Sequence, residues 1–244
     1  MIRVIVCGAL GRMGRATTEK IAQAPDMELA ARVDVATTDS SVLRSLEEFD
    51  GQADLIIDFS FHTATPAIMA WATAHNTAVI MCTTGHDEAE QAAITAAAQE
   101  IPVFQSANMS LGIALLIELA KKTAAAFPDA DIEIVETHHN RKADAPSGTA
   151  LALGKAIQQV RQDATLHMGR SGMCKRQPDE IGMHAIRRGN IPGIHEVIIS
   201  TDTQSISLKH EVYDRALFAD GALSAARFLA GKPAGLYQMT DLIH

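Results

Sequence analysis

Aromatic side chains are scarce in this sequence of 244 residues, although hydrophobic residues are not. Phe, Trp and Tyr make up 4% of the chain and hydrophobic residues 47%, so the apolar content is mostly aliphatic. This composition excludes a disordered chain, a collagen and a coiled coil as descriptions of the whole sequence. It is typical of helices packed closely on a sheet, and at about 150 residues per domain the length corresponds to roughly 1.6 domains.

Cysteine is also scarce, with three residues at Cys7, Cys82 and Cys174. Their number is odd and they lie far apart, so we expect neither a disulfide framework nor the Cys-x-x-Cys spacing of a zinc or redox site. Unpaired cysteines are usual in a reducing compartment, which predicts a cytoplasmic protein.

Positive charge is outnumbered and dispersed. The 21 Lys and Arg against 29 Asp and Glu give a net charge of −8, with no basic run or tail. This excludes nucleic acid and an anionic membrane surface as expected partners. The sequence also lacks an apolar stretch of about 18 residues and a charged segment ahead of its first strand, so we expect neither a membrane span nor a signal peptide.

Short apolar runs alternate with helical patterns through the first hundred residues. Strands are predicted at about 2–7, 29–34, 54–58, 78–82 and 102–105. Helices are predicted at about 12–24, 63–75 and 87–99, the last beginning with Asp87 and Glu90 at the spacing of a capping box. The alternation predicts an α/β fold with a Rossmann-type parallel sheet.

The pattern changes after residue 110. Helices are predicted at about 111–127, 148–161 and 214–230, an alternating strand from Asp131, and antiparallel neighbours at 196–201 and 205–210. The polar stretch 162–178 is expected to be an exposed loop. We therefore predict a dinucleotide-binding domain, 1–108, joined by a returning C-terminal helix, 213–244, and a smaller α+β domain with a mixed sheet, 109–212.

A glycine-rich turn follows the first strand and opens a helix. Gly8 permits the tight turn, Gly11 lets backbone approach a pyrophosphate, and Gly14 allows close packing of helix on strand. The phosphates would lie at the helix N-terminus. A glycine turn that serves packing alone is the alternative.

Asp34 supports the nucleotide interpretation, because it ends the second strand 20 residues after Gly14. An acid there accepts hydrogen bonds from the ribose hydroxyls, although a solvated Asp is the alternative. The next residue is Val35 rather than an arginine that could bind a 2′-phosphate, and Arg12 is the one nearby cation. We therefore predict that NADH is used at least as well as NADPH. Polar turns at 82–85 and 106–110 follow two further strands and are expected at the same edge of the sheet.

The segment 136–149 holds the densest chemistry. His138, His139, Arg141 and Lys142 precede Ser147, a predicted helix cap, so cations and free backbone N–H groups converge on a site for a small carboxylate or dicarboxylate. Metal binding is disfavoured, because adjacent histidines on a strand point to opposite faces and zinc-like spacing is absent. A merely polar surface turn is the other alternative.

These motifs resemble the dihydrodipicolinate reductase family along nearly the whole chain. The most specific match is His-His-Asn-Arg-Lys-Ala-Asp-Ala-Pro-Ser-Gly-Thr-Ala at 138–150. Weaker matches are the turns 8–14, 82–85 and 106–110, and the segments 187–195, 218–222 and 235–239.

The resemblance implies reduction of a cyclic unsaturated dicarboxylate by NADH or NADPH, giving tetrahydrodipicolinate for diaminopimelate and lysine synthesis. It implies that His138 and Lys142 handle the proton and that His139, Gly148 and Thr149 bind substrate. Closure of the second domain, with hinges near Ser110 and the start of the last helix, would bring substrate to the hydride. The resemblance also implies a homotetramer assembled through the sheet of that domain. The residues that it implies for the cofactor are Gly8, Ala9, Leu10, Gly11, Arg12, Met13, Asp34, Cys82, Thr83, Thr84, Ser106, Ala107, Asn108 and Met109.

The sequence departs from the family pattern at a few points. Cys82 stands where glycine is usual and adds bulk beside the cofactor turn, Met109 replaces a common Phe, an acid is replaced by Ser or Gln within 204–207, and the segment 35–53 is short. Two other functions stay open: a dinucleotide-dependent dehydrogenase of another small acid, and a non-catalytic NADH sensor.

Overall fold

The computed structural model describes residues 1–243, which form two compact units. The first comprises residues 1–111 and the segment from Ala216 onward, and the second comprises Gly112–Arg215. Both ends of the described chain therefore belong to the same unit.

The first unit is built on six parallel strands in the order β11-β5-β4-β3-β1-β2. The strands are β1 (Ile2–Cys7), β2 (Met27–Val33), β3 (Leu55–Asp58), β4 (Ala78–Met81), β5 (Pro102–Gln105) and β11 (Gly235–Tyr237). The central strands consist largely of buried aliphatic residues, as expected for a parallel sheet covered on both faces. The order reverses at β1, which has β2 on one side and β3 on the other, and ligands of such sheets bind beyond the carboxyl ends of the strands at that reversal.

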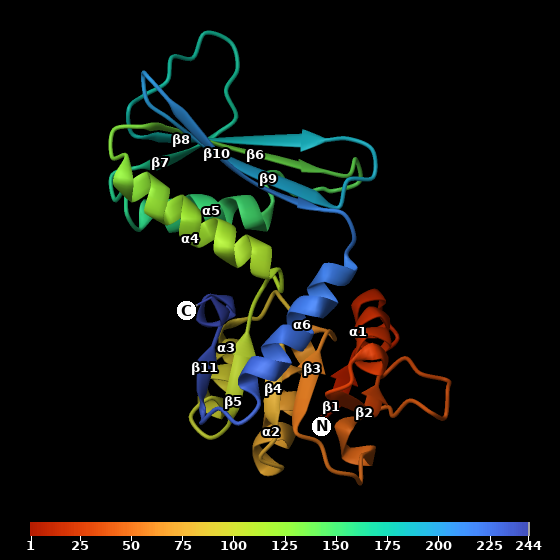
Figure 1. Ribbon diagram of the computed structural model, residues 1–244. Helices are drawn as coiled ribbons and strands as arrows, with labels where there is room; N and C mark the ends of the chain where they lie inside the picture. Colours follow the sequence, from red (N-terminus) through yellow and green to blue (C-terminus); the bar gives the residue numbers. More distant parts are fainter. Residues whose placement is uncertain (244) are drawn as a thin grey trace. The chain divides into compact units, whose positions relative to one another are not determined.

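Helices cover both faces of this sheet (Figure 1). They are α1 (Arg12–Gln23), α2 (Thr65–Ala74), α3 (Glu88–Ala97) and α6 (Ala216–Leu229). α2 and α3 bury Trp71 and Ile94 against one face, whereas Phe228 of α6 meets Phe104 of β5 on the other, with ring centroids 6.3 Å apart.

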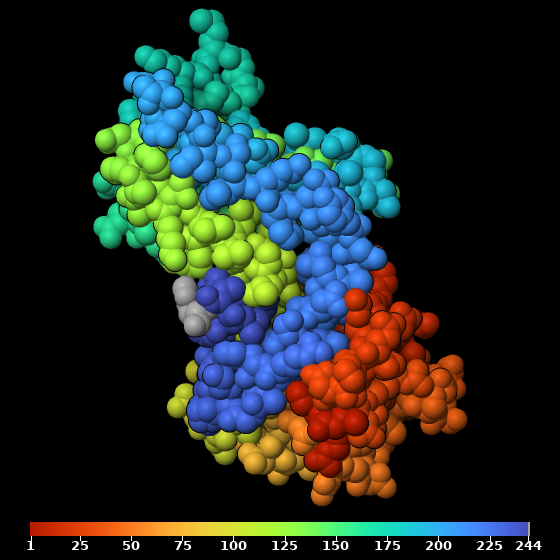
Figure 2. Space-filling model, viewed as in Figure 1, coloured from red at the N-terminus to blue at the C-terminus, as the bar shows by residue number. Residues whose placement is uncertain are grey.

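The C-terminal helix α6 lies along the first helix, α1, and the blue and red segments are adjacent in the space-filling view (Figure 2). Lys20 of α1 pairs with Asp220 of α6 at 2.7 Å, and Arg227 pairs with Asp26 at 2.7 Å. These charges are partly or largely exposed, so they contribute less to holding α6 in place than its buried alanines do.

The second unit has a mixed sheet in the order β10-β9-β6-β8-β7, with two helices on one face (Figure 1). The elements are α4 (Leu111–Ala126), which begins at the unit boundary, β6 (Asp131–His138), α5 (Gly148–Gln158), β7 (Thr165–Met168), β8 (Glu180–Arg187), β9 (Gly193–Ser200) and β10 (Ser205–Val212). Alternate residues of β6 and β9, such as Ile132, Ile134 and Val197, face α4 and α5 and are buried. As predicted, β9 and β10 are antiparallel neighbours.

The prediction of an exposed loop at 162–178 was wrong in part, because β7 lies inside it and forms the sheet edge. Neither β8 nor β11 was predicted. β8 contains Gly182 and His184 within its alternation, and β11 has three residues, so neither carries a clear strand pattern.

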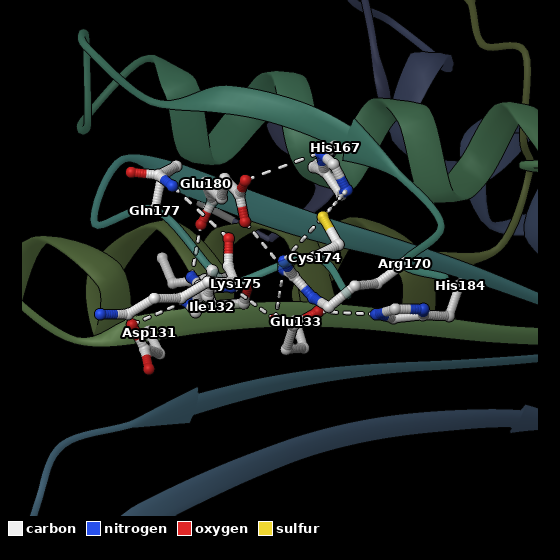
Figure 3. A network of polar contacts seen from close by, with 11 residues as sticks. Asp131, Ile132, Glu133, His167, Arg170, Cys174, Lys175, Gln177, Glu180 and His184 are labelled. Carbon is white, nitrogen blue, oxygen red and sulfur yellow. Dashed lines mark hydrogen bonds and ion pairs between the residues drawn. The ribbon is translucent and has the colours of Figure 1, made fainter. Parts of the chain in front are cut away.

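The segment between β7 and β8 is tied down by ion pairs. Arg170 reaches Glu180 at 2.8 Å, and Arg176 donates to Glu133 of β6. Figure 3 shows Glu133 linked to both Arg170 and His184, and His167 linked to both Glu180 and Cys174. The polar side chains of this segment therefore form ion pairs with the neighbouring strands instead of being free in solvent.

Candidate functional site

The turn after β1 requires two of its glycines. Gly8 has φ +70°, and a Cβ there would lie 2.5 Å from the Phe59 carbonyl oxygen. A Cβ on Gly14 would lie 2.1 Å from the carbonyl oxygen of Gly8. Side chains at either position would force the backbone apart, so these glycines allow the start of α1 to pack directly on the end of β1.

The N-terminus of α1 and Asp34 together fit a dinucleotide. Gly11 caps α1 without any side-chain hydrogen bond, so the first backbone N–H groups of the helix stay available to an anion. Asp34 follows β2 and accepts hydrogen bonds from the N–H groups of Leu10 and Ala36, each at 3.0 Å. N–H groups suited to donate to a phosphate and a carboxylate suited to accept from a ribose therefore lie on adjacent turns.

A hollow of about 460 Å³ lies beside these turns. It is lined by Ala9, Leu10, Arg15, Thr18, Glu19, Arg32, Ala36, Thr38 and Asp39. Arg12, which the sequence indicated as the one nearby cation, is not among these residues, and Arg15 and Arg32 are. Two cations besides Arg12 therefore lie near these turns, Arg15 one helical turn into α1 and Arg32 on β2, and contact of Arg12 with the cofactor stays a prediction.

Asp58, at the end of β3, is a polar residue that the sequence analysis missed. It is fully buried and accepts hydrogen bonds from the Ser60 hydroxyl at 2.5 Å, the Ser60 N–H at 3.0 Å and the Thr83 hydroxyl at 2.6 Å. Burial raises the pKa of this carboxyl although the hydrogen bonds oppose the rise. Asp58 thus joins the turn after β3 to the predicted cofactor turn after β4. Its position at the end of a predicted strand is the feature of the sequence that could have marked it as a site residue.

The remaining predicted cofactor turns lie at strand ends of the same sheet. Burial raises the pKa of the Cys82 thiol well above its ordinary value, so this residue packs as a small apolar group. Ser106 and Asn108 form a closed turn, in which the Ser106 hydroxyl donates to the Asn108 carbonyl at 2.8 Å. A larger hollow, of about 640 Å³, is lined by Met1, Asp54 and Lys232 among others and includes none of the predicted site residues.

His138 ends β6 and rests on a buried carboxylate. Its Nδ1 lies 2.5 Å from Oε2 of Glu136, and Glu136 is fully buried. Arg187 of β8 binds both oxygens of Glu136 at 2.7 Å, and the Ser147 N–H donates to Oε1 at 3.0 Å. Burial works to raise the pKa of Glu136, but the hydrogen bonds from Arg187 and His138 outweigh it and leave the pKa below its ordinary value.

The start of α5 is open to a ligand. Ser147 caps the helix by accepting from the Ala150 N–H at 3.2 Å, and a Cβ on Gly148 would meet nothing within 4 Å. Lys142 pairs with Asp144 at 2.8 Å in the loop before this helix. The first turn of α5 is therefore reachable, with a lysine in the loop that precedes it.

Two further histidines each have a buried ring nitrogen. Nδ1 of His139 is buried and has no hydrogen-bond partner among the described residues, and burial together with Arg141 and Arg215 lowers its pKa. His195 of β9 is 4% exposed, contacts the Ser147 hydroxyl at 3.1 Å and has a pKa of about 4, chiefly because it is buried and lies beside His138. Sequence reasoning had noted His195 only as part of a weaker family match.

Other site types find no support in the part of the chain that is described. Within residues 1–243 there is no group of three His, Cys, Asp or Glu side chains arranged to hold a metal ion. The same residues contain no helix with the length and apolar character needed to cross a membrane.

A parallel sheet with a glycine turn after its first strand and an acid after its second, together with a second unit in which a lysine precedes an open helix N-terminus, is the architecture of an NAD(P)H-dependent oxidoreductase. Family models for dihydrodipicolinate reductase match both parts, its N-terminus over residues 2–109 and its C-terminus over residues 112–243. The chain belongs to the dihydrodipicolinate reductase family.

Individual relatives agree along their full lengths. A protein of Caldanaerobacter subterraneus subsp. tengcongensis named 4-hydroxy-tetrahydrodipicolinate reductase is 44% identical over 247 residues, which cover 100% of this chain and 98% of the relative. One of Clostridium novyi with the same name is 40% identical over 248 residues, with the same coverage. In fold, the chain is similar to a dipicolinate-bound dihydrodipicolinate reductase from Paenisporosarcina sp. TG-14, with a TM-score of 0.83 and 24% identity over 98% of this chain and 97% of that one.

Proposed function

We propose that this chain reduces a cyclic unsaturated dicarboxylate to tetrahydrodipicolinate with NADH or NADPH, as a 4-hydroxy-tetrahydrodipicolinate reductase of diaminopimelate and lysine synthesis. The name shared by its relatives supports this reaction. The observation that carries it is the meeting of His138, on a buried carboxylate, with the open N-terminus of α5. A reducible dicarboxylate needs both a proton donor and an anion site.

The substrate carboxylates are bound by the first turn of α5, at Gly148 and Thr149, and by Lys142 and His139. A helix N-terminus and an ammonium group both favour a negative ligand, and the unobstructed Gly148 lets a carboxylate approach the backbone. The buried Nδ1 of His139 supplies a further hydrogen-bonding atom. Lys142 can exchange its exposed partner Asp144 for the substrate.

The dinucleotide, when bound, supplies a hydride and is left oxidised. The proton that completes the reduction goes to the neighbouring ring carbon, and we assign its delivery to Nε2 of His138, with Lys142 holding the negative charge that develops on the ring. Nδ1 of His138 is occupied by Glu136, which leaves Nε2 as the atom that can serve the substrate. For both roles, the charged side chains of His138 and Lys142 must already be in position before the reaction begins.

A coupled assay tests the function: the condensation product of pyruvate and aspartate semialdehyde is generated in place while NADH absorbance is followed. We expect oxidation by the wild-type chain and a fall in kcat of roughly 10²-fold or more for His138→Gln and Lys142→Ala, the usual scale for a lost general acid. Lys155→Ala, exposed in the same unit, is the matched control and keeps its activity. Turnover only with other keto or imino acids indicates another dehydrogenase, and tight NADH binding without oxidation indicates a sensor.

For the cofactor we propose that the turn 8–13, Asp34, and the turns 82–84 and 106–109 form the binding edge, and that NADH is used at least as well as NADPH. Asp34 attracts the ribose hydroxyls of NADH and repels a 2′-phosphate. Arg15 and Arg32 line the neighbouring hollow and offset part of that repulsion. Comparison of kcat/KM for the two cofactors tests this, and a strong preference for NADPH contradicts it.

We also propose that the protein acts in the cytoplasm as a homotetramer built on the second sheet. The face of that sheet away from α4 and α5 carries the partly exposed Val135, Ile186, Ile194 and Ile198, an apolar patch suited to association. Light scattering in solution measures the assembly, and a monomeric mass contradicts it.

A further inference from the structure

The carboxylate of Glu136 connects three segments that are distant along the chain. It accepts hydrogen bonds from His138 at the end of β6, from Arg187 at the end of β8 and from the backbone N–H of Ser147 at the start of α5. Both of its oxygens are used, and no part of the side chain is exposed to solvent. Such a buried charge is stable only because each oxygen has its partners.

Arg187 extends the network to the loop that carries Lys142. Its second guanidinium nitrogen donates to the Asp144 carbonyl at 2.6 Å as well as to Glu136, and the side chain of Asp144 pairs with Lys142. A planar guanidinium can make these bonds in several directions at once, which a lysine cannot. The Glu136–Arg187 pair therefore contacts every segment to which we assign a proton or a substrate carboxylate.

We propose that Glu136 and Arg187 form a buried positioning pair, which fixes the proton-donating edge of His138 relative to the carboxylate-binding start of α5. This inference rests on the proposed function. Because one carboxylate oxygen receives Nδ1–H of His138, the ring keeps Nε2 turned into the site. Because the other oxygen holds the Ser147 N–H, the anion site cannot shift independently of that ring.

The groups around His138 allow the effect of Glu136 on its ring to be tested separately from other contacts. The titratable groups that interact with its ring are Glu136 and His139 on either side of it in the chain and His195 on β9. Arg187 lies behind Glu136, and the Lys142–Asp144 pair stands in the following loop. The ring also packs on Gly193, where a Cβ would stand 3.1 Å from Nε2. Among the described residues, the carboxylate that is hydrogen-bonded to the ring is that of Glu136, so replacing Glu136 removes the negative charge in direct contact with His138.

The test is Glu136→Gln, an amide of the same shape. The amide cannot accept on both sides, so the hydrogen bond from His138 or the one from Ser147 is lost. We expect kcat to fall by roughly 10²-fold or more and KM for the dicarboxylate to rise, because ring and helix both shift, whereas His138→Gln lowers kcat with little change in KM. We also expect the high-pH limb of the kcat profile to move to lower pH, since the protonated ring loses its carboxylate partner.

Two conservative variants guard against a merely structural effect. Glu136→Asp keeps the charge and is expected to restore the wild-type pH profile with a reduced kcat, and Arg187→Lys keeps the charge but loses the forked bonds and is expected to raise KM. Glu133→Gln is the matched control, a carboxylate on the same strand that pairs with arginine on the opposite face. NADH affinity, which reports on the first unit, is expected to be unchanged in all four variants.

A readout without turnover separates this inference from the proposed function. In the wild-type protein we expect a low-field imidazole N–H proton resonance from His138, which disappears in both His138→Gln and Glu136→Gln. Wild-type KM, pH profile and resonance in folded Glu136→Gln would overturn the positioning role. If that variant does not fold, wild-type kinetics in both Glu136→Asp and Arg187→Lys would do so. Absence of wild-type turnover with the resonance present counts against the proposed function alone.

Discussion

Gly221, in the middle of α6, lies against the predicted cofactor turn at Met109. A Cβ on Gly221 would stand 1.7 Å from the Met109 carbonyl oxygen, and real Cβ atoms keep at least 3.0 Å from such an atom. In Gly221→Ala the helix and the turn must therefore separate by about 1.3 Å. The obstacle is backbone, so no side-chain rotation relieves it.

The size of the effect follows from two opposing contributions. Alanine favours a helix interior over glycine by about 1 kcal/mol. Overpacking a buried site typically costs about 1–3 kcal/mol, and the upper end applies where backbone must move. We expect a net loss of about 2 kcal/mol in the free energy of unfolding, which lowers Tm by roughly 4–8 °C in a chain of this size. Displacement of the Met109 turn is expected to weaken NADH binding by at least about fivefold, the equivalent of one hydrogen bond of about 1 kcal/mol.

Thermal unfolding followed by circular dichroism and NADH titration followed by fluorescence measure the two effects. Gly154→Ala is the matched control, because Gly154 is also buried within a helix but its Cβ would meet the end of the Leu166 side chain, 2.7 Å away, which can rotate. We expect that control to have a Tm equal to or above that of the wild type. A Gly221→Ala protein with unchanged Tm and NADH affinity would refute the reasoning, as would an equal loss in the control.

Three further outcomes are expected. His195 has a pKa of about 4 in the folded chain and an ordinary value of 6.5 when unfolded, so unfolding takes up a proton and stability falls as pH drops from 6.5 towards 4. Between pH 7 and 5 the wild type should lose roughly 1–2 kcal/mol more than His195→Gln in urea unfolding, and equal losses would contradict this. Ser147→Ala removes the cap of α5 and should destabilise the protein by about 1 kcal/mol, whereas unchanged stability would show that the cap contributes nothing. Asp34→Ala should raise KM for NADH more than KM for NADPH, and a uniform change in both would argue against a ribose contact.

Sequence reasoning succeeded where structure is determined by near neighbours. The capping box of α3 is an example: Asp87 accepts from the Glu90 N–H at 2.8 Å, and Glu90 accepts from the Asp87 N–H at 2.9 Å. The glycine turn and the segment 138–150 were recognised for the same reason, because their chemistry lies within one short stretch. Local hydrogen bonds leave a fixed spacing in the sequence.

The contacts that only folding creates were missed. Glu136 and Arg187 are 51 residues apart and meet because β6 and β8 are parallel neighbours, but the strand β8 itself was not predicted. In the sequence Asp58 is an ordinary strand end, and its hydrogen bond with Thr83, in the turn after the neighbouring strand β4, exists only in the folded chain. Arg15 and Arg32 share a hollow although neither position is marked by a pattern. Contacts of this kind depend on which strands become neighbours, and that is determined by the whole sequence rather than by any short stretch of it.

The arrangement of the two units along the chain bears on how the protein is made. The second unit is one continuous segment, Gly112–Arg215, inserted into a first unit whose sheet ends in β11 and whose face is covered by α6. All of the second unit is synthesised before α6 and β11, and until β11 is added β5 is an edge strand of the first sheet. A chain that ends before Ala216 would therefore contain every strand of the second sheet but lack the strand that borders β5 and the helix that covers the first sheet.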